Sequence, residues 1–450
     1  MMSCKRLFLI IVILCNFPFL LAQNNHQASM IISASKSEKT PLLLGLVGNN
    51  IQLTSCADIL KIMLEQKHFK TMGFQVAQEN FLSIPSKRTI KKYGSSHPIG
   101  IFLEYNKKNN ALVWRLYDTF YASMIKGGQF NIQDMPVRVQ AEHLADQLWP
   151  ALTGQPGFFS TRIAFCKDIK SNNQRGIKQL CVIAPYAQTT KSDDNAFLNT
   201  LIERGKVFAP RWNQDTQNPL VLYSESTLSN VRLMSVDLKQ KRKIISNFDG
   251  LNMLPSFSSD GKRVVYCLSI NSKSQLYLYE LNEDKETAHL KRLTHNAGNN
   301  LSPFLCANGD IIFCSDFEGK GPQICRYHHK DNVIEAITRN GYYACPVLNP
   351  KIEVIAYCKN VKGYMQIYLY DTKTKKHEQV TFDNTHKEEC TWSPCGNLLA
   401  YSVDTGKTSR IALFNTNTRE QQFITAAHER CTYPAWSPQY ERPIVLASRD

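Results

Sequence analysis

Several signatures of catalysis and cofactor binding are missing from this sequence. Its 450 residues contain no C-x-x-C pair, which gives a zinc or thiol-redox site little support. No G-x-S-x-G motif occurs, so the nucleophile of an α/β-hydrolase is absent. No glycine-rich phosphate loop follows any predicted strand. We therefore expect no cofactor and no metal, and no hydrolase domain of the α/β type.

Long apolar runs are also scarce, with one exception at the start of the chain. Lys5 and Arg6 precede an apolar run from Leu7 to Leu21, and Ala22 supplies a small residue at the expected cleavage point. This pattern is typical of a signal peptide. No later run is long enough to span a membrane, which takes about 18 apolar residues or more. We predict that residues 1–22 are a cleaved signal peptide and that the mature chain is soluble and exported.

The charge has no concentrated basic stripe. The formal net charge of +15 is spread over the N-terminal and C-terminal parts of the chain. An electrostatic nucleic-acid site would gather its lysines and arginines on one face or along one helix. We therefore predict no nucleic-acid partner. A basic solvated surface of this kind suits acidic partners or an anionic cell envelope.

Cysteines recur at equivalent places instead of forming metal-ligand pairs. Two of the 14 lie within residues 1–22, so twelve remain in the mature chain. Four of them end similar apolar segments, namely Cys166, Cys267, Cys314 and Cys358. A repeated position of this kind favours a small buried apolar side chain. We expect mostly free, buried thiols, and one or two disulfides remain open in an exported protein.

A repeat organises the C-terminal two thirds of the chain. Its best copy is TWSPCGNLLAY, from Thr391 to Tyr401, and related stretches precede and follow it. The copies align on a proline or its cysteine replacement, and neighbouring anchors are 43 to 48 residues apart. A period of about 40 to 50 residues is typical of a propeller or a solenoid. The anchors are Pro210, Pro255, Pro303, Pro346, Cys390 and Pro434.

Each repeat contains four predicted strands, which is the content of one propeller blade. Six anchors therefore predict an all-β six-bladed β-propeller over residues 158–450. Because the chain stops shortly after the first strand of the sixth repeat, the strands at 161–166 and 178–184 must complete that blade. One aromatic position recurs after the anchor, and we expect it to pack between neighbouring blades. It holds Trp212, Phe257, Trp392 and Trp436.

The preceding residues 37–157 mix helices and strands and predict a small α/β domain. An apolar strand at 41–48 is followed by Ser55 and Asp58, which we interpret as the start of a helix. Strands follow at 73–79, 98–105 and 111–120, the last two as a hairpin. The basic segment 85–94 favours a short helix. A last helix covers Val137 to Leu148 and ends near Gly154.

The order of signal peptide, α/β domain and six repeats resembles the TolB family, the periplasmic propeller component of the Tol-Pal envelope system. FSTRIAFC (159–166) resembles the family's domain junction, and YPAWSP (433–438) resembles its C-terminal signature. The resemblance implies a non-catalytic periplasmic scaffold that binds two proteins, Pal and TolA. It also implies a role in outer-membrane integrity, in outer-membrane invagination during cell division and in protein import.

The resemblance places Pal, the peptidoglycan-associated lipoprotein, at the mouth of the propeller channel, in loops just before the anchors. The matching positions are Leu251, Leu254, Leu301, Ser302, Ala344, Glu388, Glu389 and Thr432. It places TolA, of the inner-membrane motor complex, on the N-terminal segment 23–36. The matching residues there are Gln23, Ala28, Met30, Ile31, Ile32 and Ser33.

Two other functions stay open from the residues. A propeller sugar lyase would need histidines or a metal cluster in the channel, and the candidates are His328, His329, His386 and His428. A propeller sugar-binding protein would need neither the α/β domain nor a free N-terminal tail. Deleting residues 23–36 would leave the binding activity of such a protein unchanged.

Overall fold

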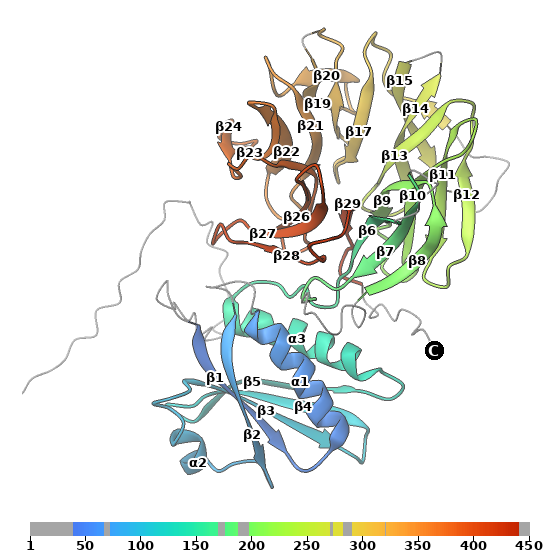
Figure 1. The fold of residues 1–450 in the computed structure, drawn as a ribbon. Helices are drawn as coiled ribbons and strands as arrows, with labels where there is room; N and C mark the ends of the chain where they lie inside the picture. The colour runs from blue at the N-terminus through green and yellow to red at the C-terminus, as the bar shows by residue number, and fades with distance from the viewer. Residues whose placement is uncertain are drawn as a thin grey trace, which may run out of the picture.

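The computed structural model describes residues 39–66, 73–169, 176–187, 198–270, 273–281, 290–319 and 321–440. The predicted signal peptide and the predicted TolA-binding segment 23–36 lie outside the described residues. The chain folds into a small α/β domain and a larger all-β part that stands above it in Figure 1. Among the described residues, no helix is long and apolar enough to cross a membrane.

The α/β domain is built on one five-stranded sheet of order β2-β1-β3-β4-β5. β1 pairs in parallel with β2 and β3, whereas β3, β4 and β5 form an antiparallel meander. The apolar run of β1 is buried on both faces, as expected for a central parallel strand. The strands are β1 (Thr40–Val47), β2 (Phe74–Phe81), β3 (Ile99–Asn106), β4 (Ala111–Asp118) and β5 (Ser123–Asn131).

Three helices accompany this sheet, α1 (Ile51–Glu65), α2 (Lys87–Lys91) and α3 (Val137–Thr153). The predicted start of α1 at Ser55 is wrong, because Asn50 is the N-cap and its side chain accepts a hydrogen bond from Leu53 N at 3.1 Å. The short helix within 85–94 is confirmed as α2, and α3 ends at Gly154, whose φ is +72°. Strand β5 was not predicted, since its sequence SMIKGGQFN contains two glycines and has no alternating apolar pattern.

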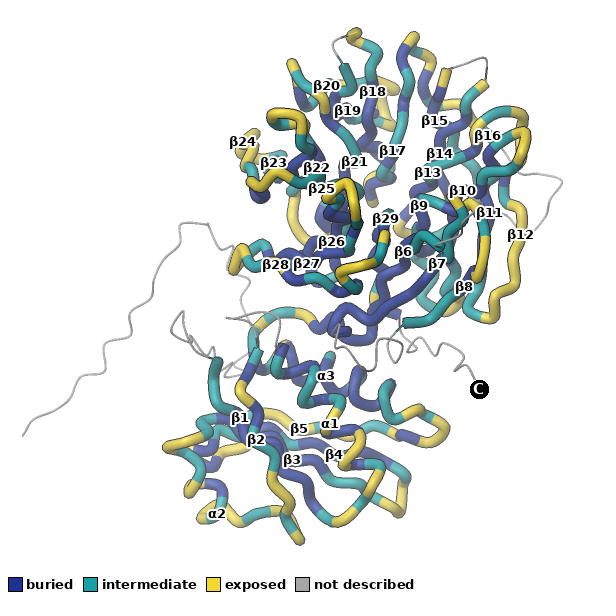
Figure 2. Tube along the Cα trace, in the orientation of Figure 1, coloured by how far each residue is buried: buried dark blue, intermediate teal, exposed yellow. Residues whose placement is uncertain are grey.

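The all-β part confirms the predicted propeller fold. Among the described residues, its strands form four sheets of four strands and one of eight. The eight-stranded sheet consists of two four-stranded halves that meet at one Val231–Leu251 pair. Each four-stranded unit thus corresponds to one predicted repeat. Figure 2 shows the inner strands mostly buried and the outer strands and turns more exposed.

The first four units follow the chain. Their strands are β9 (Val207–Trp212), β10 (Leu220–Ser226), β11 (Val231–Asp237), β12 (Arg242–Ser246), β13 (Leu251–Phe257), β14 (Arg263–Ile270), β15 (Lys273–Glu280), β16 (Leu290–Arg292), β17 (Asn300–Leu305), β18 (Ile311–Ser315), β19 (Gln323–His328), β20 (Val333–Ala336), β21 (Tyr343–Leu348), β22 (Val354–Val361), β23 (Tyr364–Asp371) and β24 (Lys376–Gln379). The fifth unit contains β25 (His386–Trp392), β26 (Leu398–Asp404), β27 (Ser409–Asn415) and β28 (Gln421–Phe423).

The last unit closes the ring with strands from both ends of the propeller sequence, as predicted. Its order is β29-β6-β7-β8, with Trp436 opposite Ile163. Arg162 and Ser437 extend the pairing, because Arg162 N donates to Ser437 Oγ at 2.9 Å and Ser437 N donates to Arg162 O at 2.8 Å. Ring closure removes sheet edges that would otherwise be exposed. The four strands are β6 (Ile163–Asp168), β7 (Lys178–Ile183), β8 (Leu198–Gly205) and β29 (Cys431–Trp436).

The recurring tryptophans join neighbouring units, as predicted. The indole N–H of Trp212 donates to Ala435 O at 3.1 Å, and that of Trp392 donates to Val347 O at 3.3 Å. Each bond runs from one innermost strand to the next. Trp436 donates instead to Thr161 Oγ1 at 2.8 Å, beside the junction with the α/β domain. The tryptophans therefore combine apolar packing with a satisfied polar tip.

One hydrophobic core runs through both parts of the chain. It contains the buried faces of α1 and α3, the linker aromatics Phe158 and Phe159, and propeller residues such as Leu398 and Trp436. Twelve cysteines of the described residues are free, and all but Cys345 are fully buried. The prediction of mostly free, buried thiols is thereby confirmed.

Candidate functional site

The innermost strands of the propeller form a closed circuit. β9, β13, β17, β21, β25 and β29 each contact the next strand in this order, and β29 contacts β9. In a propeller, the innermost strands line the central channel. The candidate site is therefore the inner surface of this ring.

A left-handed residue stands directly before the anchor in every innermost strand. Their φ angles lie between +48° and +61°, and none of them is glycine. The strand pairing shifts register at these residues, so each is part of a β-bulge. Non-glycine residues in this conformation are strained and tend to cluster at functional sites. The six are Ala209, Leu254, Ser302, Cys345, Glu389 and Tyr433.

The bulges also connect neighbouring units. Leu254 N donates to Ser224 Oγ at 3.1 Å, and Tyr433 N donates to Glu389 Oε2 at 2.5 Å. In both cases the amide freed by the bulge bonds to a side chain of the preceding unit. Side chains of the ring thus take part in holding the bulge conformation.

All eight residues predicted to contact Pal lie on these innermost strands and are at least partly exposed. The expectation that they lie in loops before the anchors is wrong, because the innermost strands begin three or four residues before each anchor. The strands bring the eight together from five of the six units. They are Leu251 and Leu254 on β13, Leu301 and Ser302 on β17, Ala344 on β21, Glu388 and Glu389 on β25, and Thr432 on β29.

One part of the ring is apolar. Met253, Leu254 and Leu301 come from β13 and β17, and their side chains pack on the core shared by these two units. Leu251, at the start of β13, is 38% exposed. A partner could bury these leucines without displacing a charge.

The opposite part of the ring is charged, and Glu389 is its central group. Its Oε2 atom accepts hydrogen bonds from Tyr433 N and, at 3.0 Å, from Ser402 Oγ. Burial raises the pKa of the Glu389 carboxyl to about 7, although both hydrogen bonds lower it. Burial also raises the pKa of the neighbouring Glu388, against the opposite effect of His386. The Glu389 carboxyl can therefore change its charge near neutral pH.

Two cations stand near these carboxylates. Lys178 Nζ donates to Thr432 Oγ1 at 3.1 Å and lies 5.5 Å from the centroid of the Tyr433 ring. Arg211, on β9, follows the anchor Pro210, and burial lowers the pKa of its guanidinium while Glu389 opposes that effect. Neither cation was predicted. The signal was present in the sequence, since Arg211 is a charged residue inside the repeated anchor stretch.

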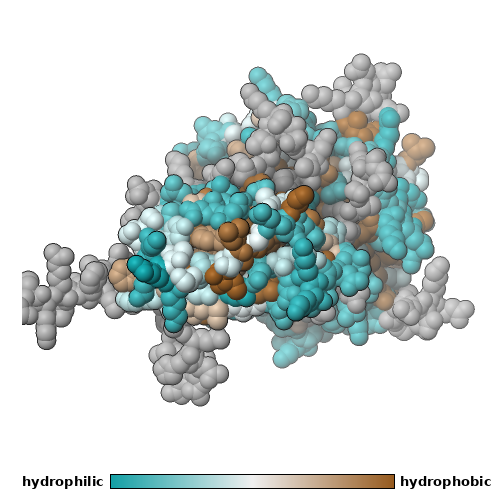
Figure 3. Space-filling view, turned by 90° about the horizontal axis from the view of Figure 1, so that it is seen from below, coloured by the Kyte–Doolittle hydropathy of each residue, from teal (hydrophilic) through white to brown (hydrophobic). Residues whose placement is uncertain are grey.

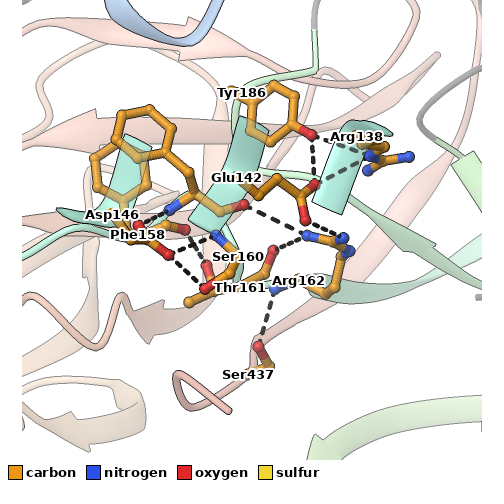
Figure 4. Close-up of polar contacts among 10 residues, drawn as sticks. Arg138, Glu142, Asp146, Phe158, Ser160, Thr161, Arg162, Tyr186 and Ser437 are labelled. Atoms are coloured by element: carbon orange, nitrogen blue, oxygen red, sulfur yellow. Dashed lines mark hydrogen bonds and ion pairs between the residues drawn. The ribbon is translucent and has the colours of Figure 1, made fainter. Parts of the chain in front are cut away.

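A second polar cluster lies where α3 meets the propeller (Figure 4). The fully buried Glu142 carboxylate accepts from Arg162 Nη2 at 2.8 Å, from Arg138 Nε at 3.0 Å and from the Tyr186 hydroxyl at 2.5 Å. Burial, with the negative charge of Glu142, raises the pKa of Tyr186, so its hydroxyl stays a donor. Together these groups bind α3 to the first strands of the ring-closing unit.

One turn further along α3, Asp146 holds the linker between the two parts. Its carboxylate accepts from Phe159 N at 2.8 Å and from Ser160 N at 3.1 Å, and Ser160 Oγ also donates to it. The sequence analysis missed this cluster. Its signal was the pair Glu142 and Asp146 within the otherwise apolar face of the predicted helix.

The candidate histidines occupy separate elements. His328 ends β19, where it contacts Asp310 and Glu335 on the outer part of its unit, and His329 also contacts Asp310. His386 begins β25 and accepts a hydrogen bond from Met365 N at 3.4 Å. His428 is exposed after β28. Within the described ranges, no group of three or more possible metal ligands is found.

This fold and this site define the class: a β-propeller joined to an α/β domain, whose channel wall carries partly exposed apolar and charged side chains. The family profile PD40, the TolB beta propeller domain, matches residues 149–440. The chain belongs to this TolB propeller family, and the family predicted from its sequence is confirmed.

Individual proteins agree with this assignment. The chain is 28% identical over 245 residues to "Tol-Pal system protein TolB" of Francisella tularensis subsp. mediasiatica, and equally similar to the protein of that name from subsp. tularensis. The alignment covers 52% of this chain and 49% of each relative, so the chain spans about half the length of these relatives.

Among solved structures, TolB from Acinetobacter baumannii matches with a TM-score of 0.73 at 21% identity, over 90% of this chain and 98% of the other. The match extends over both parts of the chain and supports the fold. Kuenenia stuttgartiensis hydrazine synthase matches with a TM-score of 0.51 at 12% identity, over 65% of this chain and 48% of the other. Its likeness also concerns the fold alone.

Proposed function

We propose that this chain is a non-catalytic periplasmic scaffold of the Tol-Pal system and that it binds Pal at the inner surface of the propeller ring. The single observation that carries the proposal is the placement of all eight predicted contact residues, at least partly exposed, on the innermost strands. Rigid strands hold such residues in fixed positions, which lowers the entropic cost of binding.

The two sides of the ring suit a protein partner. The apolar side chains of the partner contact the part of the ring lined by Leu254 and Leu301. The polar groups of the partner contact Glu388, Glu389 and Lys178 in the other part. Apolar anchors in the centre with polar groups around them are usual in protein interfaces. The proposal extends to TolA, which binds segment 23–36, and to support of outer-membrane integrity and invagination during cell division. Export through the signal peptide 1–22 belongs to the same proposal.

The test is binding of the mature protein to the soluble domain of Pal from the same organism, measured by calorimetry. Leu251→Asp places a charge on the apolar part and is expected to weaken binding at least tenfold. Ile352→Asp is the matched control, because Ile352 is 57% exposed, lies in the turn between β21 and β22 at the other end of the innermost strand, and should leave the affinity unchanged. Equal effects of both substitutions, or no binding by the unmodified protein, would contradict the proposal.

The N-terminal segment needs a separate measurement. Removing residues 23–36 should abolish binding of the soluble TolA domain. A simultaneous change in affinity for Pal would show that the two sites are coupled. Retained TolA binding by the truncated protein would instead place the TolA site elsewhere.

A further inference from the structure

We propose that the face of the α/β domain formed by α2 and the β4–β5 turn docks onto an anionic lipid bilayer. We call this face the basic-aromatic surface. α2 lies in the part of the domain farthest from the propeller (Figure 1), so docking there leaves the ring accessible. The surface consists of Leu82, Ile84, Lys87, Arg88, Lys91, Lys92, Phe120, Tyr121, Met124 and Lys126.

Its apolar side chains stand out into solvent. The exposed fraction is 96% for Leu82, 64% for Phe120, 69% for Tyr121 and 58% for Met124. Phe120 and Tyr121 touch edge to face, with ring centroids 5.0 Å apart. Clustered exposed apolar side chains mark interaction sites in soluble proteins. Figure 3 shows apolar side chains surrounded by hydrophilic ones on the face seen from below.

Two chain segments form this surface side by side. Thr119 N donates to Pro98 O at 3.1 Å, which joins the β4–β5 turn to the segment after α2. A Cβ added to Gly94 would lie only 2.8 Å from Phe120 Cα, so the two backbones are in direct contact. The aromatic turn and the basic helix are therefore held in one fixed arrangement.

The basic segment of this surface has no acidic residue of its own, and Asp118 at the end of β4 accepts a hydrogen bond from Tyr121 N at 3.0 Å. Residues 82–98 contain no aspartate or glutamate. Lys87, Arg88, Lys91 and Lys92 are exposed, and none forms an ion pair with a carboxylate among the described residues. A carboxylate on β2, that of Glu79, accepts a hydrogen bond from the Tyr93 hydroxyl at 2.5 Å. Such a group of uncompensated cations attracts an anionic surface.

The shape of the surface favours a bilayer over a polypeptide. Leu82, Phe120 and Tyr121 protrude from turns instead of lining a hollow, so a protein partner would need a cavity to receive them. A bilayer interface accepts protruding phenylalanine and tyrosine side chains directly, with lysines and arginines at the headgroup level. The combination of apolar insertion and headgroup attraction is what holds interfacial proteins on membranes.

The experiment is sedimentation of protein lacking residues 1–22, whose apolar run would itself bind lipid, with vesicles of equal parts phosphatidylglycerol and phosphatidylcholine. We expect binding to these vesicles, little binding to pure phosphatidylcholine, and weaker binding at high salt. Lys87→Glu with Arg88→Glu should lower the affinity at least 25-fold, since each cation contributes about fivefold near an anionic surface. Glutamates in the first turn of a helix also favour α2, so unfolding would not explain the loss.

Matched variants on the propeller serve as controls. Lys373→Glu with Lys376→Glu reverses two exposed lysines there, and Phe382→Ser removes an aromatic side chain that is 74% exposed. Both should bind vesicles like the unmodified protein, whereas Phe120→Ser with Tyr121→Ser should bind about tenfold more weakly.

Three outcomes of the vesicle experiment would overturn the proposal. These are no vesicle binding, equal binding to neutral vesicles, or an equal loss in the propeller controls. Binding of polyglutamate without binding of vesicles would also overturn it and would assign the surface to an acidic polypeptide. Pal binding measured on the same variants stays unchanged if the two sites are independent, so failure here is distinguishable from failure of the scaffold proposal.

Discussion

Two glutamates in this protein are largely enclosed, and their surroundings give them opposite properties. Glu142 at the domain junction contacts two arginines and a tyrosine hydroxyl, each within 3.0 Å. Glu389 in the ring accepts hydrogen bonds from one backbone amide and one serine, and its pKa rises to about 7. The two arginines in direct contact with Glu142 make its carboxylate a fixed structural element. Glu389 accepts its hydrogen bonds from neutral donors only, so its carboxyl is free to titrate.

The largest expected effect comes from neutralising the paired glutamate. Glu142→Gln removes the buried negative charge that Arg162 and Arg138 contact, which costs about 3–5 kcal/mol of the free energy of unfolding. Urea unfolding followed by tryptophan fluorescence measures this loss. A loss below about 1 kcal/mol would show that the junction is not held by this carboxylate.

A smaller effect is expected one turn along α3. Asp146→Asn keeps one acceptor oxygen but turns an N–H₂ group toward the amide of either Phe159 or Ser160, which costs about 1–3 kcal/mol. The same urea experiment applies. Because the linker would be released while the Glu142 cluster remains, chymotrypsin should cleave after Phe158 or Phe159 faster than in the unmodified protein.

The titration of Glu389 in the ring should make the free energy of unfolding depend on pH. Its folded-state pKa lies above the ordinary value of 4.5, so the folded protein binds this proton more tightly than the unfolded chain. The resulting stabilisation is fully present below about pH 4.5 and is lost as the pH rises through 7. Glu389→Gln should therefore be about 1–2 kcal/mol more stable than the unmodified protein at pH 8 and no more stable at pH 4.5.

Thermal unfolding at a series of pH values checks this difference. Glu388→Gln is the neighbouring control, and Glu389→Gln should remove the larger part of the pH dependence between pH 5 and 8. A stability advantage that is the same at every pH would contradict the assigned titration.

The smallest effect is expected for an exposed ion pair. Arg115 Nη1 lies 3.0 Å from Glu104 Oε2, and both side chains are partly exposed. Solvent screens such a pair, so Glu104→Gln should cost less than about 1 kcal/mol. A cost equal to that of Glu142→Gln would mean that burial does not explain the difference between the glutamates.

The repeat made the propeller predictable from sequence. The anchors, turns and alternating strands recur in six repeats, so a strand signal that is weak in one repeat is supported by the other five. The ring-closing role of 161–166 follows from the strands that the last repeat lacks. The α/β domain has no such repetition. Strand β5 was therefore missed, because its two glycines interrupt the strand pattern. The start of α1 was placed too late, because Ser55 has the residue type of an N-cap although it lies inside the helix.

The candidate site was predictable only in part. The positions before the anchors identify the innermost strands, but the bulge at each of them does not follow from the residue types, which range from Ala209 to Tyr433. Arg211 lies on an innermost strand directly after its anchor, whereas Lys178 belongs to β7 and reaches the ring only through tertiary packing. Glu142 was visible only as an acidic residue in an apolar helix face.

The ring-closing sheet also sets an order in time for the folding of this chain. β6 pairs with β29, and the paired residues Ile163 and Trp436 are separated by nearly the whole propeller sequence. A chain that emerges from a ribosome or an export channel from its N-terminus presents β6 long before its partner strand exists. The edge of β6 therefore remains open until the other described strands have been released. A chaperone that covers open strand edges would therefore have to protect the edge of β6 for longer than any other described edge.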